Sequence, residues 1–510
     1  AAAPSAAEND DAVCGAEGGC GSGSSRLRET NPEGYYWRRR GGGSEVVTSV
    51  PYTGPTNLSK APAWSWPNTF DEQVRHSPLI DGERSIYLAT AVRIRKFDEH
   101  GSIKWMFETT RREGRMTASP AIYKGTLYAL AYSASSRTAT MFALDMETGQ
   151  LRWRRVLEIF VYWCASSLLV YNDTIVFPFR DHFVARPVFA GDDGNNAVGA
   201  MNVSDGKLLW EYVADDTIWN MMVSTPGDGT LLFASQCGGV YRINWAGETI
   251  WRAGRRNPGR WCGTSGGTLG PNGLFYAEFN DWNKFQGVVA AHRVSDGKLV
   301  WERTWPLPLG AWQHPAVGRL APSGRLAVVA PLGLTTGPPQ FSTLSLLDYD
   351  WVPLWLRELW YERAYLKYKW IRRLLGVPLL PNALVALDAD TGQDIWWVVE
   401  EPWDRYAMAG DEERFIERMK RAQASPETHD TMCLPDNQGV PLIAGDGTVY
   451  AASGHTGDLA SIRDDDGNGV VDASEISIFG TGIGFRNGPS LAPGMLVAAP
   501  CWGPMYVFKD

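Results

Sequence analysis

The residues from 464 to 475 have the types and the spacing that suit metal binding. This segment reads DDDGNGVVDASE, and oxygen-bearing side chains occupy its positions 1, 3, 5, 9 and 12, namely Asp464, Asp466, Asn468, Asp472 and Glu475. Gly469 stands at position 6, where the chain must bend sharply, and Val470 at position 7 offers its backbone carbonyl. Because crowded carboxylates repel one another unless a cation lies between them, the pattern predicts a calcium site. The alternative is an acidic surface loop without an ion.

The spacing resembles the calcium-binding loop of EF-hand proteins. The flanking segments depart from that family, because residues 458–463 and 476–479 look like strands and not like helices. The sequence contains no second loop of this kind. We therefore expect a structural calcium ion that holds a β-hairpin together, and not a sensor that opens a pair of helices.

The elements that would position this loop belong to a repeat that runs along most of the chain. The clearest copy, residues 386–396, reads ALDADTGQDIW. Further copies, some of them looser, occupy residues 96–105, 143–153, 200–210, 241–251 and 291–301. Each copy is a strand end, a tight turn with glycine and a new strand that finishes on tryptophan. Such a tryptophan fills the space between two sheets, and its indole N–H is free to find a carbonyl.

The pattern Ala-x-Asp-x-x-Thr-Gly-x-x-x-Trp resembles the tryptophan-docking motif of PQQ-type β-propellers, over roughly residues 60–510. The resemblance implies an all-β fold of four-stranded blades. The family includes quinoprotein alcohol dehydrogenases, and it also includes propellers without a cofactor that act as scaffolds, such as the outer-membrane assembly lipoprotein of bacteria. The motif is stronger evidence for the fold than for a reaction.

Counting the copies predicts an eight-bladed β-propeller over residues 59–510. Blades one to six end at the repeat tryptophans, and blade seven ends near Phe479. The remaining tail provides only three strands, which would leave an exposed sheet edge. We expect a strand within residues 61–66 (APAWSW) to complete blade eight and to close the ring.

A second candidate site is formed by four tryptophans that precede the inner strands of blades three to six. These residues are Trp163, Trp219, Trp261 and Trp312. Because inner strands line the channel of a propeller, the indoles could gather at one mouth and bind a planar or sugar-like ligand or cofactor. Their polar neighbours would be Arg75, His76, Arg260 and His314. The alternative is that these tryptophans simply pack between blades.

The resemblance also suggests which cofactor to expect. Quinoprotein dehydrogenases of this family carry an adjacent pair of cysteines beside the quinone and an acidic base beside a calcium ion in the channel. Here the cysteines beyond the N-terminal pair are scattered, at Cys164, Cys237, Cys262, Cys433 and Cys501. The sequence thus favours calcium over PQQ as the cofactor, and no complete catalytic constellation is found in it. A PQQ-dependent oxidoreductase stays the alternative function.

Two insertions interrupt the repeat. Residues 346–380 have helical spacing, with aromatic, Arg and Lys side chains mixed over residues 351–375. This mixture is typical of a helix that contacts a membrane surface or a protein partner, and the alternative is a helix packed on the outside of the propeller. Residues 401–431 contain DEERFIERMKRA, which predicts a second, exposed amphipathic helix.

The formal net charge of the 510 residues is −9, so a nucleic-acid partner is not expected. No apolar run is long enough to span a bilayer. Residues 1–58 are rich in Ala, Gly and Ser and predict a flexible tail. Because propellers of this family mostly work outside the cytoplasm, we expect an extracytoplasmic or organelle-lumen location. The predicted function is that of a calcium-binding scaffold or binding module with a protein partner, and a subunit of a larger or membrane-associated complex is one form that such a module takes.

Overall fold

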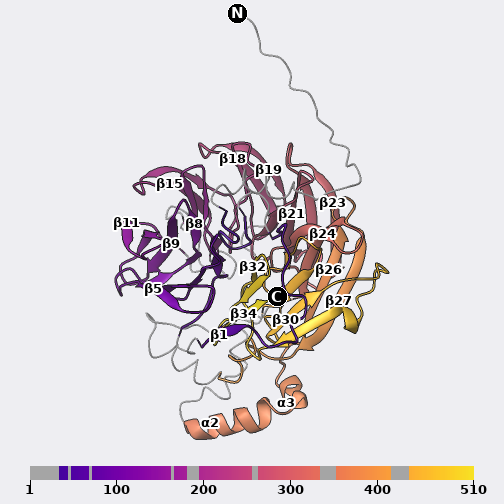
Figure 1. Ribbon diagram of the computed structural model, residues 1–510. Helices are drawn as coiled ribbons and strands as arrows, with labels where there is room; N and C mark the ends of the chain where they lie inside the picture. The colour runs from indigo at the N-terminus through magenta and orange to yellow at the C-terminus, as the bar shows by residue number, and fades with distance from the viewer. Residues whose placement is uncertain are drawn as a thin grey trace, which may run out of the picture.

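The structure is a computed structural model that describes residues 34–43, 48–67, 72–161, 166–180, 194–255, 262–333, 352–414, 433 and 436–510. Eight blades are arranged in a ring about a central axis (Figure 1). Within each blade the paired strands are antiparallel and largely follow one another in the chain. The predicted eight-bladed β-propeller is confirmed.

The first four blades take up residues 79–254. Blade one contains β2 (Leu79–Ile80), β3 (Ile86–Ala89), β4 (Arg93–Phe97) and β5 (Ile103–Glu108). Blade two contains β6 (Arg115–Met116), β8 (Ala121–Tyr123), β9 (Thr126–Ser133), β10 (Thr138–Asp145) and β11 (Leu151–Leu157). Blade three contains β13 (Leu169–Tyr171), β14 (Thr174–Phe179), β15 (Ala197–Asn202) and β16 (Leu208–Val213). Blade four contains β17 (Thr230–Ala234), β18 (Gly239–Asn244) and β19 (Thr249–Gly254).

The last four blades take up the rest of the chain. Blade five contains β20 (Gly266–Leu269), β21 (Leu274–Asp281), β22 (Gln286–Arg293) and β23 (Leu299–Pro306). Blade six contains β24 (Ala316–Leu320), β25 (Arg325–Gly333), β26 (Leu380–Asp388) and β27 (Asp394–Trp403). Blade seven contains β28 (Leu442–Ile443), β29 (Val449–Ala452), β30 (Asp458–Ile462) and β31 (Ile476–Gly480). Blade eight contains β32 (Ser490–Ala492), β33 (Met495–Ala498), β34 (Met505–Lys509) and β1 (Trp64–Trp66).

Two inner edges depart from the four-strand pattern. In blade four the innermost position is held by a single bridge between Ser224 and Leu232. Between blades two and three, β7 (Ala118–Ser119) and β12 (Ser166–Ser167) form a short parallel ladder. The inner ends of neighbouring blades are therefore joined directly at this point of the ring.

The ring closes as the sequence predicts. Strand β1 pairs with β34, and Ser65 lies opposite Tyr506 in this ladder. Figure 1 shows the indigo β1 beside the yellow β34. The Trp64 indole N–H donates to the Glu99 carbonyl of blade one at 2.9 Å, so the closing strand also binds the next blade.

The repeat tryptophans connect successive blades. The Trp301 indole N–H of blade five donates to the Ala389 carbonyl of blade six at 2.9 Å. Its ring lies on Gly392, where φ is +72° and an added Cβ would come within 2.6 Å of the ring. Glycine is therefore required both for the turn and for the close approach. The corresponding indoles of Trp105, Trp153 and Trp251 also donate to carbonyls of the following blade, at 3.0, 2.9 and 3.1 Å.

The expectation of a flexible tail over residues 1–58 does not hold for residues 34–43 and 48–58, which we call the N-terminal segment. Trp37 pairs with Ile80 of blade one, and Ser49 pairs with Ile443 of blade seven. The Ile122 N–H of blade two donates to the Arg38 carbonyl at 2.9 Å, and the Val317 N–H of blade six donates to the Thr48 hydroxyl oxygen at 3.3 Å. The segment therefore crosses the channel between the inner strands of these blades. Cys14 and Cys20 lie outside the described residues.

The first insertion leaves blade six between β25 and β26. It forms α2 (Leu354–Trp360), a π-helical turn (Tyr361–Tyr365) and α3 (Lys369–Leu374), which project from the rim of the ring (Figure 1). In the part of the chain that the structure describes, no helix has the length and hydrophobicity to cross a membrane.

The second predicted helix is not found where the structure describes residues 401–431. Residues 401–403 belong to strand β27, and residues 404–414 form bends and turns. Most of the amphipathic pattern, from residue 415 onward, lies outside the described residues. The strand continues here because its inner edge still pairs with β26, up to the pair Leu380–Trp403.

Candidate metal centre

The acidic loop is the turn of a β-hairpin, as expected from its flanks. Strands β30 and β31 of blade seven pair from Asp458–Gly480 to Ile462–Ile476, and the loop joins them at that end. A single 3-10 turn, η3 (Ala473–Glu475), leads into β31. The hairpin therefore fixes both ends of the loop in space.

The loop brings three carboxylates together. One oxygen each of Asp464, Asp466 and Glu475 lies within 4.8 Å of the others. Asp464 is only 5% exposed. Its Oδ2 accepts from the Gly469 N–H at 3.1 Å, whereas its buried Oδ1 has no hydrogen-bond partner among the described residues. A buried carboxylate oxygen without a donor is costly, and a cation beside Asp464 Oδ1 would offset that cost.

The remaining predicted ligands are held by the loop backbone in this structure. Asn468 Oδ1 accepts from the Val470 N–H at 2.6 Å, and the Asn468 amide donates to Asp466 at 2.8 Å. Asp472 caps η3, and its own N–H donates to Glu475 at 2.9 Å. The loop is thus ordered by its own hydrogen bonds, with Asp464, Asp466 and Glu475 as the cluster. Oxygen ligands of this kind fit calcium, a hard cation.

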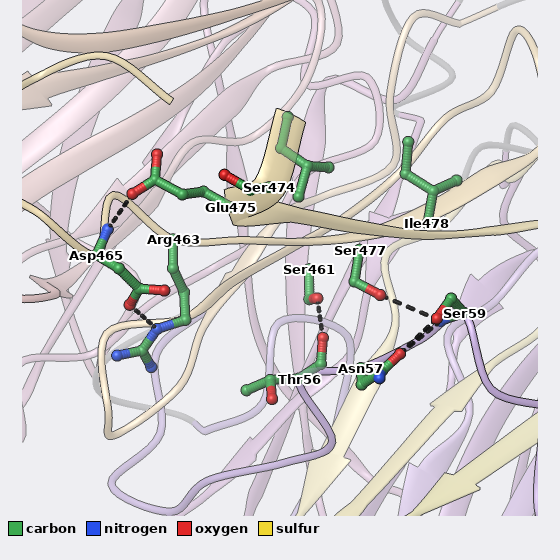
Figure 2. Close-up of a pocket in the computed structure, with 11 residues that line it drawn as sticks. Thr56, Asn57, Ser59, Ser461, Arg463, Asp465, Ser474, Glu475, Ser477 and Ile478 are labelled. Carbon is green, nitrogen blue, oxygen red and sulfur yellow. Dashed lines mark hydrogen bonds and ion pairs between the residues drawn. The ribbon is translucent and has the colours of Figure 1, made fainter. Parts of the chain in front are cut away.

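A polar cavity of about 570 Å³ lies beside the loop. Thr56, Asn57 and Ser59 of the N-terminal segment and its continuation form one wall, and Ser461, Ser477 and Glu475 of blade seven lie opposite (Figure 2). The two walls are tied together, because the Ser477 hydroxyl oxygen accepts from the Leu58 N–H at 2.8 Å. The figure also shows the Glu475 carboxylate accepting from the Asp465 N–H, at 2.6 Å. Glu475 therefore belongs to both the carboxylate cluster and the cavity.

Comparison with known proteins agrees with this architecture. The family described as outer membrane protein assembly factor BamB matches residues 60–159. The structure of BamB from Moraxella catarrhalis is similar with a TM-score of 0.52 and 14% identity, covering 88% of this chain and 99% of that chain. Quinohemoprotein alcohol dehydrogenase from Comamonas testosteroni is similar with a TM-score of 0.57 and 12% identity, covering 96% of this chain and 82% of that chain.

The fold is that of a PQQ-like β-propeller. No curated protein matches the sequence. At these identities the similar structures establish the fold, and the use of this PQQ-like propeller must be argued from its own residues.

The structure describes only two of the four tryptophans of the second predicted site, Trp219 and Trp312. Trp163 and Trp261 lie outside the described residues. Trp312 is 3% exposed, and its carbonyl accepts from the Thr264 hydroxyl. Trp219 is half-buried and lies within 3.1 Å of the position that a Cβ on Gly194 would take. Trp312 and Trp219 thus have packing contacts of their own.

The histidines predicted to accompany them are buried. His314 Nε2 lies 3.0 Å from the Asn220 carbonyl, and burial followed by the nearby Arg40 charge lowers the pKa of His314 to about 3. Burial and the charge of Arg75 lower the pKa of His76 to about 3 as well. Both imidazoles are therefore neutral at physiological pH and serve as hydrogen-bonding groups of the channel wall.

The channel of the propeller is partly filled by its own chain. Residues 37–42 of the N-terminal segment are buried in it. The described cysteines form two disulfides between residues distant in sequence, Cys237–Cys262 and Cys433–Cys501. Neither disulfide joins neighbouring cysteines, and Cys164 lies outside the described residues. The sequence analysis did not predict that this segment lies in the channel. Trp37, an aromatic residue within the predicted tail, is a signal that could have indicated its burial.

Proposed function

We propose that this PQQ-like propeller is a calcium-binding scaffold that works outside the cytoplasm and contacts an anionic membrane surface through its helical insertion. The observation that supports it best is the construction of the insertion. Its base is buried and hydrogen-bonded, whereas its tip presents large apolar side chains to solvent. Apolar side chains exposed in this number on a fixed support are typical of a binding surface.

The base of the insertion is anchored to the propeller by aromatic stacking and hydrogen bonds. The rings of Tyr361 and Tyr365 stack with their centroids 4.7 Å apart, and both side chains are buried. The Tyr361 hydroxyl donates to the Glu412 carbonyl at 2.7 Å. Arg372 forms a buried ion pair with Asp404, with 3.0 Å between Nη2 and Oδ2. Removing either partner of such a pair is costly, so the base holds the tip in a fixed orientation.

The tip carries aromatic and aliphatic side chains. The exposed fractions of Trp355, Leu359, Trp370 and Leu374 are 65%, 45%, 63% and 79%. Leu366, which the helical spacing assigned to the same side, packs instead against the buried tyrosines. Exposed basic residues accompany the tip, namely Arg363, Lys367, Lys369 and Arg373. Indole rings with Arg and Lys suit the interface of an anionic bilayer, where apolar groups enter the headgroup region and cations remain near phosphates.

The calcium loop and the disulfides support a location outside the cytoplasm. Disulfides persist in oxidising compartments, and a single calcium loop is filled where calcium is plentiful. The scaffold function is preferred over a quinoprotein oxidoreductase because the N-terminal segment occupies the channel in which that alternative needs its cofactor.

Flotation with vesicles tests the membrane contact. We expect the protein to float with vesicles that contain phosphatidylglycerol and to stay behind with pure phosphatidylcholine. Replacing both Trp355 and Trp370 by alanine should reduce flotation at least tenfold. Phe285, which is 66% exposed in the turn between β21 and β22 of blade five, provides the control, because Phe285→Ala should float like the wild type. Equal flotation of the double variant and the wild type contradicts the proposal, and binding to a protein but not to vesicles would assign the surface to a protein partner.

A further inference from the structure

A buried arginine in the channel lacks partners for its guanidinium group. Arg39 belongs to the N-terminal segment and is 2% exposed. Its Nε donates to the Gly43 carbonyl at 3.0 Å. Its Nη1 and Nη2 atoms are also buried, and within the described residues neither has a hydrogen-bond partner. Four of the five N–H donors of this side chain are therefore unsatisfied.

Arg39 lies among other positive charges. It is close enough to His314 to lower the pKa of that imidazole, as is Arg40, which also acts on His76. Arg486, whose buried Nε lacks an acceptor among the described residues, acts on His76 as well. In the part of the chain that the structure describes, neither Arg39 nor Arg486 forms an ion pair with an acidic side chain.

The charge on Arg39 persists at neutral pH. Burial and the neighbouring Arg38 lower the pKa of Arg39 to about 9, which still leaves the guanidinium protonated at pH 7. A charged group without a partner costs several kcal/mol when it is removed from water. Because the surrounding backbone holds the segment between blades one, two, six and seven, Arg39 has no simple route to the surface.

We propose that the channel of this propeller binds a small oxyanion, of the phosphate, sulfate or carboxylate class, with Arg39 as the main donor. The planar guanidinium presents two parallel N–H groups, which match two oxygens of such an anion. The anion neutralises the arginines around the two histidines and fixes the N-terminal segment in the channel. The site is thus built by the chain's own N-terminal segment and not by the inner strands alone.

Anion release and thermal unfolding test this site. Protein is purified in phosphate, desalted into chloride and then denatured. Ion chromatography of the released anions should detect about one phosphate per chain. The unfolding temperature is then measured in phosphate, sulfate and succinate, each compared with chloride at the same ionic strength. The preferred class of anion should raise the unfolding temperature by about 2 °C or more. The Arg39→Gln variant should lose this rise, whereas Arg373→Gln, at an exposed basic position on α3, should keep it.

The Arg39→Met variant distinguishes an anion from trapped water. An arginine that meets only water should be replaced by an apolar side chain of similar length without loss of stability. If the anion is bound, Arg39→Met should unfold at a lower temperature than the wild type in phosphate. The proposal is overturned if the denatured wild type releases no anion and none of the three anions stabilises it more than chloride. It is also overturned if the anions stabilise wild type and Arg39→Gln equally.

Discussion

Blades six and seven form the same hairpin turn in two different ways. In blade six, Asp388 Oδ1 accepts from the Thr391 N–H at 2.8 Å, and Oδ2 accepts from Arg325 Nε at 2.6 Å. In blade seven the equivalent turn is the acidic loop, where Asp464 Oδ1 has no donor in the described part of the chain. The blade-six turn is thus satisfied by protein donors, whereas the proposed calcium ion would satisfy the open oxygen of the blade-seven turn. If the proposed site binds calcium, the repeat has replaced the internal donors of one turn with further carboxylates.

The two turns also differ in how they contact the docking tryptophan of the preceding blade. Gly392 of blade six is covered by the Trp301 ring. In blade seven, Trp396 is 2% exposed and packs in a cluster that includes Val471 and Ile476, on either side of η3. The longer loop of blade seven therefore contributes apolar side chains where blade six contributes a bare glycine. The following changes separate the contribution of the docking tryptophans from that of the cation.

The largest effect is expected for Trp301→Ala, which removes the ring that covers Gly392. The cost should be about 3 kcal/mol of unfolding free energy, because an aromatic contact and an indole hydrogen bond are lost together. Urea denaturation with and without EDTA should give the same loss, since blade six needs no cation. Trp355→Ala, which removes an indole that is 65% exposed, should change the stability by no more than about 0.5 kcal/mol. A loss that disappears in EDTA would show that the two turns are not independent.

Calcium removal is expected to have the next largest effect. An ion present at about 100 times its dissociation constant stabilises the folded state by about 2.7 kcal/mol, and EDTA should abolish this gain. The Asp464→Asn variant should lose the response to calcium, because it removes the charge on the buried oxygen. The matched variant Asp388→Asn weakens the blade-six turn but should respond to calcium like the wild type. Calorimetric titration that finds unchanged calcium affinity in Asp464→Asn would refute the site.

Much of the propeller could be predicted because its signals are local. The turn glycines and docking tryptophans recur within about eleven residues, as in residues 386–396, and each turn forms from its own side chains. The closing strand followed from one physical argument, the cost of an unpaired edge after Phe479. In the acidic loop, the spacing singled out Asp464, Asp466 and Glu475, whose carboxylates lie close together. It could not show that Asn468 and Asp472 bond to the loop backbone in this structure.

The errors concern residues whose environment is set by distant parts of the chain. Arg38 to Arg40 look like solvated charges, yet all three side chains are buried. Glu412 fits the polar face of an exposed helix, but it is fully buried, where its Oε2 accepts from the Ala407 N–H at 2.7 Å. Burial of a charge depends on partners that no local pattern contains. Composition therefore misled at the positions where polar groups enter the interior.

The smallest effect on stability is expected at the interface between blades six and seven, where Glu400 of β27 lies. Its carboxylate accepts from Asn382 at 2.6 Å and from Gln438 at 2.5 Å. Burial, opposed by hydrogen bonds from Ser453 and Gln438 and reinforced by Asp458, raises the pKa of Glu400 to about 7. A raised carboxyl pKa favours the protonated form in the folded state, so this contribution to stability is complete below about pH 4.5 and is lost as the pH rises to about 7.

Glu400→Gln should therefore become more stable relative to the wild type as the pH increases from 5 to 8, by about 2 kcal/mol. Glutamine keeps the shape and a hydrogen-bonding oxygen but cannot ionise. The neighbouring Glu401 is exposed, and Glu401→Gln should give a stability curve parallel to that of the wild type. Unfolding in urea at several pH values, with calcium held constant, measures the difference. Parallel curves for Glu400→Gln and the wild type would mean that Glu400 ionises as freely as an exposed carboxylate. Protonation of Glu400 would then contribute nothing to the stability of the blade interface.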